Sequence, residues 1–387
     1  MKDIPKGCKV LTIRGGSFRF KWRIQMKVAD MHCDTISIIL KSKQILEKTE
    51  SNKETKNKEE KNNQETEMIC NQDTMLQTPI SLKRNKLHLD IEKMKAGDYL
   101  VQNFAMYTNL KNRDKPLEWC LKLIDTFYEE IEQNKDSIRV VKTYKDILEN
   151  KAEGKLSALL TIEEGGVTKG ELAHLRNFYR LGVRMMTLTW NYINELGYPN
   201  AITPNGEEAY RTCPNTVNGL TKKGKEFLYE MERLGMIIDV SHLSDAGFYD
   251  VIKHTSKPFV ASHSNARSVC NHYRNMTDDM IRALANRGGV MGINFEPEFL
   301  QEVKDGEVAH GSLSLIVKQI KHIIHIGGYE CVGLGSDFDG INTNEELKDG
   351  ADMPLLEQAL RDEGFSNEVI EAIFYKNVMR VYKEILK

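Results

Sequence analysis

The chain has 387 residues, with 54 basic and 56 acidic side chains and a net charge of −2 at pH 7. This balance produces no global field that would attract nucleic acid or an anionic membrane, so we expect a small or neutral partner. The seven cysteines are odd in number and form no C-x-x-C pair. They are typical of free thiols in the reducing cytoplasm rather than of a disulfide framework.

The first 26 residues precede the first apolar run of the chain. Lys and Arg residues interrupt them, so they lack the apolar core of a signal peptide and secretion is not expected. No stretch reaches the roughly 18 consecutive apolar residues of a membrane span. Our hypothesis is that residues 1–25 are a dispensable extension or a start-site artefact and that the native protein starts at Met26 rather than Met1.

A polar segment follows the first apolar run, from about residue 43 to residue 86. It is rich in Lys, Glu, Asn, Gln and Thr and poor in apolar residues. Such a segment cannot bury enough surface to offset the entropy that ordering costs. We therefore predict a mobile insertion without a catalytic role, whose removal would leave activity nearly intact.

Eight short apolar runs recur along the chain. Most are continuous in Val, Ile, Leu, Met and Ala, as in strands that are covered on both faces. Helical periodicity separates them; one such segment carries Phe227 and Met231 on one face and stops at Gly235. The alternation predicts a single (β/α)8 TIM barrel over residues 27–387, with the final helices packed on its outside. The runs cover residues 27–32, 99–106, 157–163, 184–190, 236–242, 258–263, 289–295 and 331–337.

Ionisable residues collect at the ends of these runs, where barrel enzymes place their catalytic groups. They are His32, Asp34, Glu163, His242, His263 and Asp337. The number of ligands suggests two metal ions, one held by His32 and Asp34 and the other by His242 and His263, with a carboxylate shared between them. Imidazole and carboxylate suit zinc, and manganese or cobalt is also compatible. Two ions about 3.5–4 Å apart can bind one hydroxide and polarise a carbonyl, which predicts metal-assisted hydrolysis. The remaining histidines, among them His272, are assigned structural or surface roles.

The chain carries a set of short motifs: His32-Cys-Asp34, Glu163 before Gly165-Gly166, Asp239-Val-Ser-His242, Ser262-His263-Ser264, Arg274-Asn275 and Gly335-Ser-Asp337-Phe-Asp339-Gly340. Taken together, these motifs resemble the membrane dipeptidase (renal dipeptidase) family, and its bacterial and cytosolic branch in particular. The resemblance runs from about Met26 to the C-terminus and leaves out the extension and the polar insertion. It implies a barrel that hydrolyses free dipeptides, often with a D-residue at the C-terminal position, through a hydroxide bridging two zinc ions.

The resemblance implies a ligand set for the two zinc ions. His32 and Asp34 match the ligands of one ion, and His242 and His263 match those of the other. Glu163 matches the carboxylate that bridges them.

Further residues match catalytic and substrate-binding positions of the family. Asp337 matches the acid/base aspartate, and Arg274 matches the arginine that takes the substrate carboxylate. An alternative for Arg274 is pairing with Asp278 or Asp279 on its own loop. Glu164 could replace Glu163, although Glu163 follows the apolar strand directly.

One position departs from the family. The animal enzymes carry a substrate-binding histidine where this chain has Trp190, and indole offers a single N–H donor in its place. Asn191 or Asn194 could supply the missing contact, or Trp190 could simply close the pocket wall. The substrate preference therefore stays open.

Three functions compete on these observations. The first is a cytoplasmic zinc dipeptidase with a small dipeptide as its partner, without nucleic acid or membrane, and as a monomer or a homodimer. The second is a related amidohydrolase acting on N-acyl amino acids or lactams. The third is a catalytically inactive barrel that binds metal or peptide, and Asp337 argues against it because a structural site needs no carboxylate beside its ligands.

Overall fold

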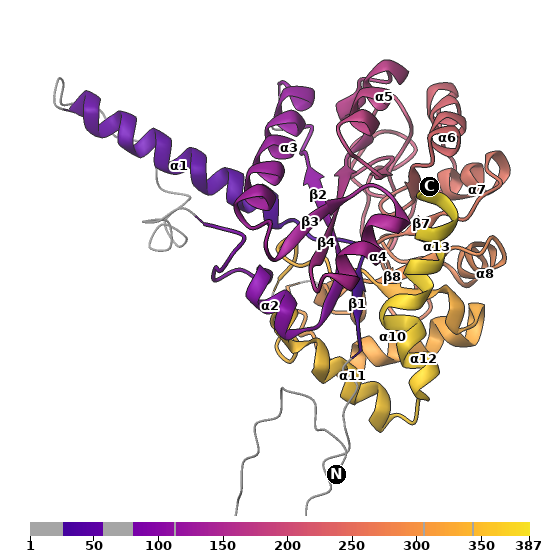
Figure 1. The fold of residues 1–387 in the computed structure, drawn as a ribbon. Helices are drawn as coiled ribbons and strands as arrows, with labels where there is room; N and C mark the ends of the chain where they lie inside the picture. Colours follow the sequence, from indigo (N-terminus) through magenta and orange to yellow (C-terminus); the bar gives the residue numbers. More distant parts are fainter. Residues whose placement is uncertain (1–25, 57–79, 112–113, 305, 343) are drawn as a thin grey trace, which may run out of the picture.

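Eight parallel strands form a closed ring at the centre of the molecule, and helices surround it (Figure 1). The neighbours follow the order β2, β1, β9, β8, β7, β6, β5, β4, and a pairing of β2 with β4 closes the ring. Each predicted run overlaps one of these strands, so the (β/α)8 barrel is confirmed. The computed structural model describes residues 26–56, 80–111, 114–304, 306–342 and 344–387, so the predicted extension lies outside the described residues up to residue 25. The ring strands are β1 Val28–Asp30, β2 Tyr99–Tyr107, β4 Leu156–Glu163, β5 Met185–Thr187, β6 Ile237–Asp239, β7 Val260–Ala261, β8 Val290–Ile293 and β9 Val332–Leu334.

A ninth strand, β3 (Ile138–Val141), lies beside the ring and was not predicted. It pairs in parallel with the first half of β4, from Leu156 to Leu159, whereas β5 pairs with the second half of β4. The run Ile-Arg-Val-Val is short and has two half-buried residues at its centre. Hydrophobic periodicity over four residues gives too little signal to identify such a strand.

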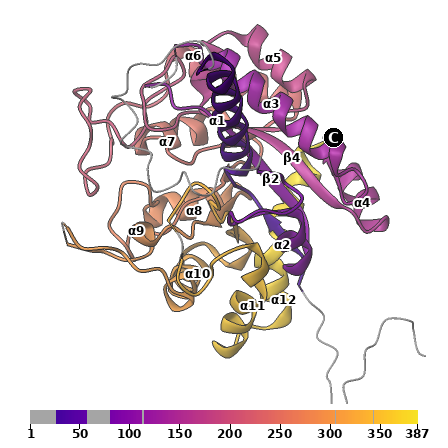
Figure 2. The same ribbon diagram turned by 90° about the vertical axis from the view of Figure 1, so that its left-hand side faces the viewer.

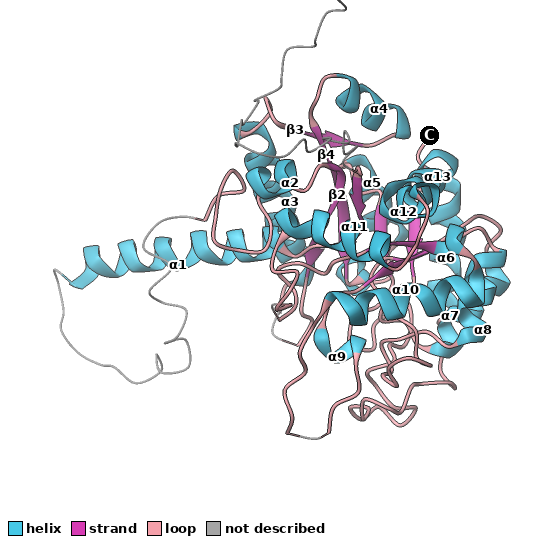
Figure 3. Ribbon diagram, turned by 90° about the horizontal axis from the view of Figure 1, so that it is seen from below, coloured by secondary structure: helices cyan, strands magenta, loops and turns pink. Residues whose placement is uncertain are grey.

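Several helices begin or end at residues with the capping preferences that the sequence predicts. Thr277 accepts a hydrogen bond from the backbone of Met280 at the start of α8, and Gly235 ends α6 with a positive φ of 77°. Figure 3 shows the helices around the strands. Among the described residues, no helix is both long and apolar enough to cross a bilayer. The helices are α1 Thr35–Lys56, α2 Ile91–Ala96, α3 Pro116–Gln133, α4 Tyr144–Ala152, α5 Leu172–Arg180, α6 Lys222–Leu234, α7 Asp245–His254, α8 Asp278–Asn286, α9 Pro297–Leu300, α10 Leu313–Gly327, α11 Met353–Asp362, α12 Asn367–Glu371 and α13 Asn377–Ile385, with a π-helical segment at Ala372–Lys376.

The last helix closes one end of the barrel, so the prediction that both final helices pack on the outside is wrong for α13. Side chains of α13, among them Val381 and Tyr382, belong to one buried cluster with inward-facing strand residues such as Leu159 and Ile237. The Tyr382 hydroxyl donates a 2.8 Å hydrogen bond to the side chain of Asn103 in β2. The C-terminal helix therefore covers the interior of the ring at the end opposite the carboxyl ends of the strands.

The predicted polar insertion begins inside α1, which runs on to Lys56 and extends away from the barrel (Figures 1 and 2). Its other end also contacts the core: Leu82 is fully buried, and its backbone N–H donates to Glu130 at 2.8 Å. Residues 57–79 lie outside the described residues. The prediction of a mobile segment is therefore wrong for residues 80–86, because one leucine there is part of the core.

Candidate metal centre

The six ionisable side chains singled out above meet at the carboxyl ends of the ring strands. Only Glu163 belongs to a strand, and the others follow the last residue of their strand by two to four positions. His242 and Asp337 have positive φ values of 67° and 62°, a backbone conformation that non-glycine residues rarely adopt. The predicted strands were too long at these ends, because the chain turns there and presents the functional side chain to the cluster.

Glu163 lies at the centre of the cluster and divides its two oxygens between two groups of histidines. Its Oε1 lies 3.1 Å from Nε2 of His242 and 3.5 Å from Nε2 of His263, whereas its Oε2 lies 3.3 Å from Nε2 of His32. Burial raises the pKa of Glu163, but the charge of His32 and the close contacts with the three histidines outweigh it and hold the pKa well below its usual value. This is the arrangement expected of a carboxylate that bridges two ions.

His242 and His263 face each other, with 3.0 Å between their Nε2 atoms. Burial lowers the pKa of His242 to about 4 and that of His263 well below its usual value, so both rings are neutral. Nδ1 of His242 lies 2.9 Å from Oδ1 of Asn191 and donates to it, which leaves the lone pair on Nε2. Two nitrogen ligands of a tetrahedral zinc ion lie about 3.3 Å apart, so this pair fits one ion.

His32 and Asp34 form the other half of the cluster. Both ring nitrogens of His32 and one oxygen of Asp34 are buried without a hydrogen-bond partner among the described residues. Such atoms are costly unless a cation satisfies them. Burial lowers the pKa of His32, but the charges of Glu163 and Asp34 raise it well above its usual value. The carboxylates that favour a proton on this ring also favour a metal ion beside it.

The ligand atoms group into three overlapping sets. Within each set the candidate atoms lie no more than 4.8 Å apart, and every residue is buried. A buried cluster of imidazoles and carboxylates matches the ligand preferences of zinc. The sets are His32 with Asp34 and Glu163, Glu163 with His242 and His263, and His32 with His263 and Asp337.

Asp337 is held beside the cluster by an asparagine that sequence reasoning missed. Nδ2 of Asn294 donates to Oδ2 of Asp337 at 2.8 Å, and Oδ1 of Asp337 lies 3.8 Å from Nε2 of His32. Burial raises the pKa of Asp337 to about 8, with a contribution from the charges of Asp34 and Glu163 that His32 opposes. The available signal was the place of Asn294 at the end of the run at residues 289–295.

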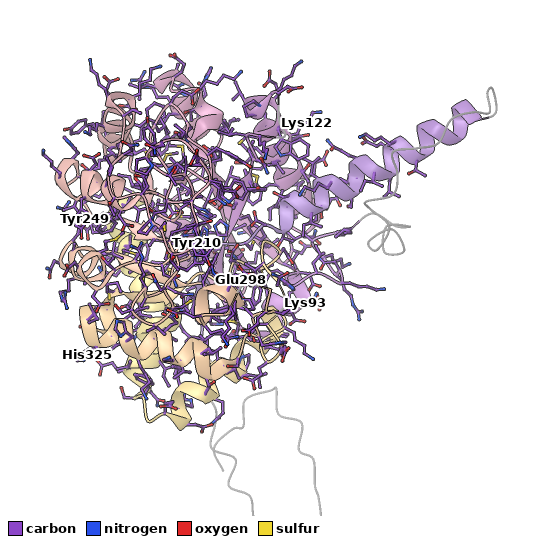
Figure 4. All side chains as sticks on the ribbon, turned by 180° about the vertical axis from the view of Figure 1, so that it is seen from behind. Lys93, Lys122, Tyr210, Tyr249, Glu298 and His325 are labelled. Carbon is purple, nitrogen blue, oxygen red and sulfur yellow. The ribbon has the colours of Figure 1, made fainter. Side chains whose placement is uncertain are left out.

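A cleft of about 470 Å³ opens beside these side chains. One wall comes from the start of α1 and the loop after β9, and the other from residues 272–274 and α9. Figure 4 labels one of the residues that line the cleft, Glu298. His325, also labelled there, is exposed on α10 and is not part of the lining. Besides the cluster, the cleft is lined by Ser37, Ile38, Lys41, Tyr107, Trp190, Asn191, His272, Tyr273, Arg274, Glu296, Glu298, Phe299, Asp339, Gly340, Ile341 and Asn342.

Arg274 reaches this cleft from a buried position. It is 6 % exposed, its Nη2 donates to the backbone oxygen of His263 at 3.0 Å, and its Nε has no hydrogen-bond partner among the described residues. The guanidinium lies 5.4 Å from the ring centre of Phe299. Burial lowers the pKa of Arg274, which the charges of Asp337 and Glu163 partly offset. A cation in this setting favours an anionic ligand.

The alternative partners of Arg274 bond elsewhere. Asp278 accepts from Ser268 and contacts His322 at 2.8 Å, and Asp279 accepts from Arg282.

Glu164 faces away from the cluster and organises the loop that carries Trp190. It accepts from the backbone of Gly166 at 2.7 Å, from the backbone of Trp190 at 3.0 Å and from the side chain of Asn194. The structure thus brings Glu163, and not Glu164, into the cluster. Asn194 serves this loop and is absent from the cleft lining, whereas Asn191 lines the cleft while it contacts His242.

Aromatic rings form one wall of the cleft. Trp190 packs edge to face on Tyr107, with 5.0 Å between ring centres, and lies 6.1 Å from the ring of His242. His272, which we had assigned a structural or surface role, lines the cleft as well and accepts from the backbone of Arg274 at 3.1 Å. The signal for His272 was its position two residues before Arg274.

Known proteins are similar to this chain in sequence or in fold. The chain resembles an uncharacterized dipeptidase of Schizosaccharomyces pombe, with 33% identity over 310 residues, 77% of this chain and 72% of the relative. An uncharacterized protein from the pqqA 5′ region of Klebsiella pneumoniae is 36% identical over 249 residues, 64% of this chain and 89% of its own.

Solved structures with the same fold include a metallopeptidase from Rhodobacter sphaeroides liganded with a phosphinate mimic of the dipeptide L-Ala-D-Ala. It is 23% identical, has a TM-score of 0.74, and the match covers 93% of this chain and 99% of that one. A dipeptidase of family M19 gives a TM-score of 0.75 at 24% identity, with the same coverage. The family model for membrane dipeptidase (peptidase family M19) matches residues 24–387. The chain therefore belongs to the membrane dipeptidase family, M19, a family of metal-dependent peptide hydrolases.

Proposed function

We propose that the protein hydrolyses the peptide bond of free dipeptides, L,D-dipeptides included, at a centre of two zinc ions. The observation that carries the proposal is the division of the Glu163 oxygens between His32 on one side and His242 with His263 on the other. Two zinc ions in these positions, when bound, would supply an activated water and polarise the scissile carbonyl. Manganese or cobalt could take their place in the cell.

The two halves of the cleft suggest how a dipeptide lies in it. Arg274 bonds to the backbone of His263, so the substrate carboxylate would lie on the side of the His242 and His263 pair. The N-terminal residue would then point toward Asp34, the start of α1 and Tyr107. A guanidinium at a fixed distance from the scissile carbonyl measures substrate length, because only a dipeptide ends in a carboxylate there.

Asp337 would carry the proton of the reaction. Its Oδ1 lies 3.8 Å from Nε2 of His32 at the edge of the cluster, where the carboxylate can act first as a general base and then as a general acid. Asn294 occupies Oδ2, so Oδ1 would accept the proton from the attacking water and pass it to the leaving amine. Trp190 offers one indole N–H and a flat aromatic wall where the animal enzymes have a histidine, so it would contact the substrate with a single donor.

The ligand of one solved structure bears on the substrate, and the cysteines of this chain bear on its location. The dipeptide mimic bound by the Rhodobacter sphaeroides structure is L-Ala-D-Ala, which supports including L,D-dipeptides. Cys33, Cys120, Cys213, Cys270 and Cys331 are free, which supports a cytoplasmic location.

The test combines zinc analysis with a hydrolysis panel of L,L-dipeptides, L,D-dipeptides, tripeptides and N-acetyl amino acids. We expect two zinc ions per chain and turnover of dipeptides but not of tripeptides. Turnover confined to N-acyl amino acids or lactams would identify a related amidohydrolase instead. A zinc-loaded protein that binds dipeptides without cleaving them would be an inactive binding barrel.

A further inference from the structure

A buried carboxylate outside the metal cluster, Asp239, lies at the end of β6. It is fully buried and accepts four hydrogen bonds. Its Oδ1 accepts from the backbone N–H groups of Ser241 at 3.0 Å and Ser262 at 2.8 Å, and its Oδ2 accepts from the hydroxyls of Ser262 and Thr187, both at 2.6 Å. The network joins the ends of β5, β6 and β7, and the mechanism above does not use it.

The direction of the protons in this network follows from its chemistry. Both oxygens of Asp239 accept hydrogen bonds from its neighbours, and the Ser262 hydroxyl donates its single proton to Oδ2. Nδ1 of His263 lies 2.7 Å from the Ser262 oxygen, which has only lone pairs left to offer in that contact. Nδ1 of His263 must therefore carry the ring proton, and Nε2 carries the lone pair that faces Glu163 and His242.

We infer that Ser262, held by Asp239, is a positioning residue that fixes the tautomer of His263 for metal binding. This inference deepens the proposed metal centre and rests on it. The backbone adds orientation, because the N–H of His263 donates to the Ser241 hydroxyl at 3.1 Å. Partners behind a metal-binding histidine contribute to affinity in this way because the free ring could otherwise place its proton on the nitrogen that must bind the ion.

The molecule contains a matched comparison for this role. Ser336 donates to the buried Asp30 with the same geometry, 2.9 Å from its backbone N–H and 2.6 Å from its hydroxyl. Its hydroxyl oxygen also lies 3.3 Å from the backbone oxygen of His32 and accepts from the backbone of Phe338. Both serines thus have a buried carboxylate partner, but only Ser262 contacts an imidazole nitrogen.

The experiment measures zinc binding to the full chain by competition with a chromophoric chelator. Ser262→Ala should weaken the binding of one of the two zinc ions by about 10–100-fold, the usual effect of losing such a partner. Ser262→Thr keeps the hydroxyl and should restore tight binding. Ser336→Ala removes an equivalent serine–aspartate contact and should leave that zinc dissociation constant near the wild-type value. Equal weakening by Ser262→Ala and Ser336→Ala would overturn the inference.

The tautomer itself can be read without metal and without substitution. In the metal-free protein labelled with ¹⁵N-histidine, we expect the His263 Nδ1 signal to be that of a protonated nitrogen and the Nε2 signal that of an unprotonated one. In Ser262→Ala the proton should redistribute toward Nε2. An unprotonated Nδ1 in the wild-type protein would overturn the inference even if Ser262→Ala does not fold. A wild-type protein that binds no zinc would defeat the proposed function, while this spectrum would still test the tautomer.

Discussion

Arg274 offers the most direct test of how a single side chain reads the substrate. Arg274→Lys should lower kcat/KM for free dipeptides, because lysine cannot reproduce the bidentate geometry of guanidinium. The expected loss of transition-state stabilisation is roughly 2–4 kcal/mol. Dipeptide amides lack the carboxylate, so their kcat/KM should change little. Zinc content should stay the same. Steady-state kinetics on matched acids and amides measures the difference.

Arg267 provides the control for that substitution. It is also largely buried, but both ends of its guanidinium bond to Asp245, at 2.7 and 2.8 Å. Arg267→Lys should lower the free energy of unfolding without distinguishing acids from amides. Equal kinetic losses on acids and amides in Arg274→Lys would mean that Arg274 shapes the site rather than binds the carboxylate.

Asp337→Asn separates proton transfer from metal binding. The amide keeps the size of the carboxyl group but cannot take up a proton at neutral pH, so kcat should fall by about 10²–10⁴-fold. Zinc content, measured by atomic absorption, should remain at the wild-type value. Loss of an ion would instead assign Asp337 to the ligands, as its proximity to His32 and His263 would allow.

At the residue scale, the ionisable side chains of the cluster were predictable from the sequence. The neutral residues that hydrogen-bond to them were not. His32, Glu163 and Asp337 stand at the ends of apolar runs, and position alone identified them. Asn294 and Ser262 are neutral residue types that are common in any chain. Their importance lies in which atom they face, and that depends on contacts between strands that no single-strand pattern contains.

At the scale of elements, the end of the predicted insertion should be part of the fold. Leu82→Ala removes a fully buried side chain and should lower the free energy of unfolding by about 2–5 kcal/mol. Lys83→Ala, at an exposed neighbouring position, should change it by less than about 0.5 kcal/mol. Urea denaturation of both variants measures the difference. Similar values for the two would show that this segment contributes little, as its composition had suggested.

An ion pair between helices should make stability depend on acid pH. Hydrogen bonds from Arg233 and Arg176 hold the pKa of Glu230 at about 2 against the opposing effect of burial, and Arg176 belongs to α5 whereas Glu230 belongs to α6. A depressed folded-state pKa stabilises the protein above the unfolded pKa of about 4.3 and loses that stabilisation as pH falls toward 2.

Glu230→Gln should therefore lower the free energy of unfolding by about 1 kcal/mol at pH 7, a modest value because both arginines are substantially exposed. The difference from wild type should shrink between pH 4.5 and pH 2. Glu149→Gln, which removes an exposed pair with Lys145, is the control and should have a smaller effect at every pH. A pH-independent difference for Glu230→Gln would contradict the assignment.

The elements themselves were predictable where their pattern is long. α6 ends at Gly235, which adopts a positive φ, and α8 and α10 begin after Thr277 and Ser312, whose side chains accept hydrogen bonds from the first turn. These are local effects that the sequence shows directly. β3 and the true ends of the short strands were not predictable. They depend on pairing with β4 and on left-handed turns at His242 and Asp337, which are set by the closed ring.

At the scale of the whole molecule, α13 should stabilise the barrel without affecting catalysis. Tyr382→Phe leaves the buried Asn103 oxygen without its donor and should cost about 1–3 kcal/mol of unfolding free energy. Asn103 lies four residues before the end of β2, away from the rim, so kcat/KM and zinc binding should not change. Tyr375→Phe removes a half-buried contact with Glu371 and serves as the control with a smaller cost. A catalytic defect in Tyr382→Phe would show that the base and the rim are coupled.

The closure of the barrel by its last helix has a consequence for how the protein is made. Tyr382 and Asn103 are 279 positions apart in the sequence, and β1 pairs with β9 to complete the ring. During synthesis the first strands leave the ribosome long before their partners exist, and the apolar interior is covered only when the final helix has emerged. Contacts between such distant residues slow folding and leave unpaired edges exposed meanwhile. Nascent chains that stall before α13 should therefore be preferred substrates of chaperones and proteases.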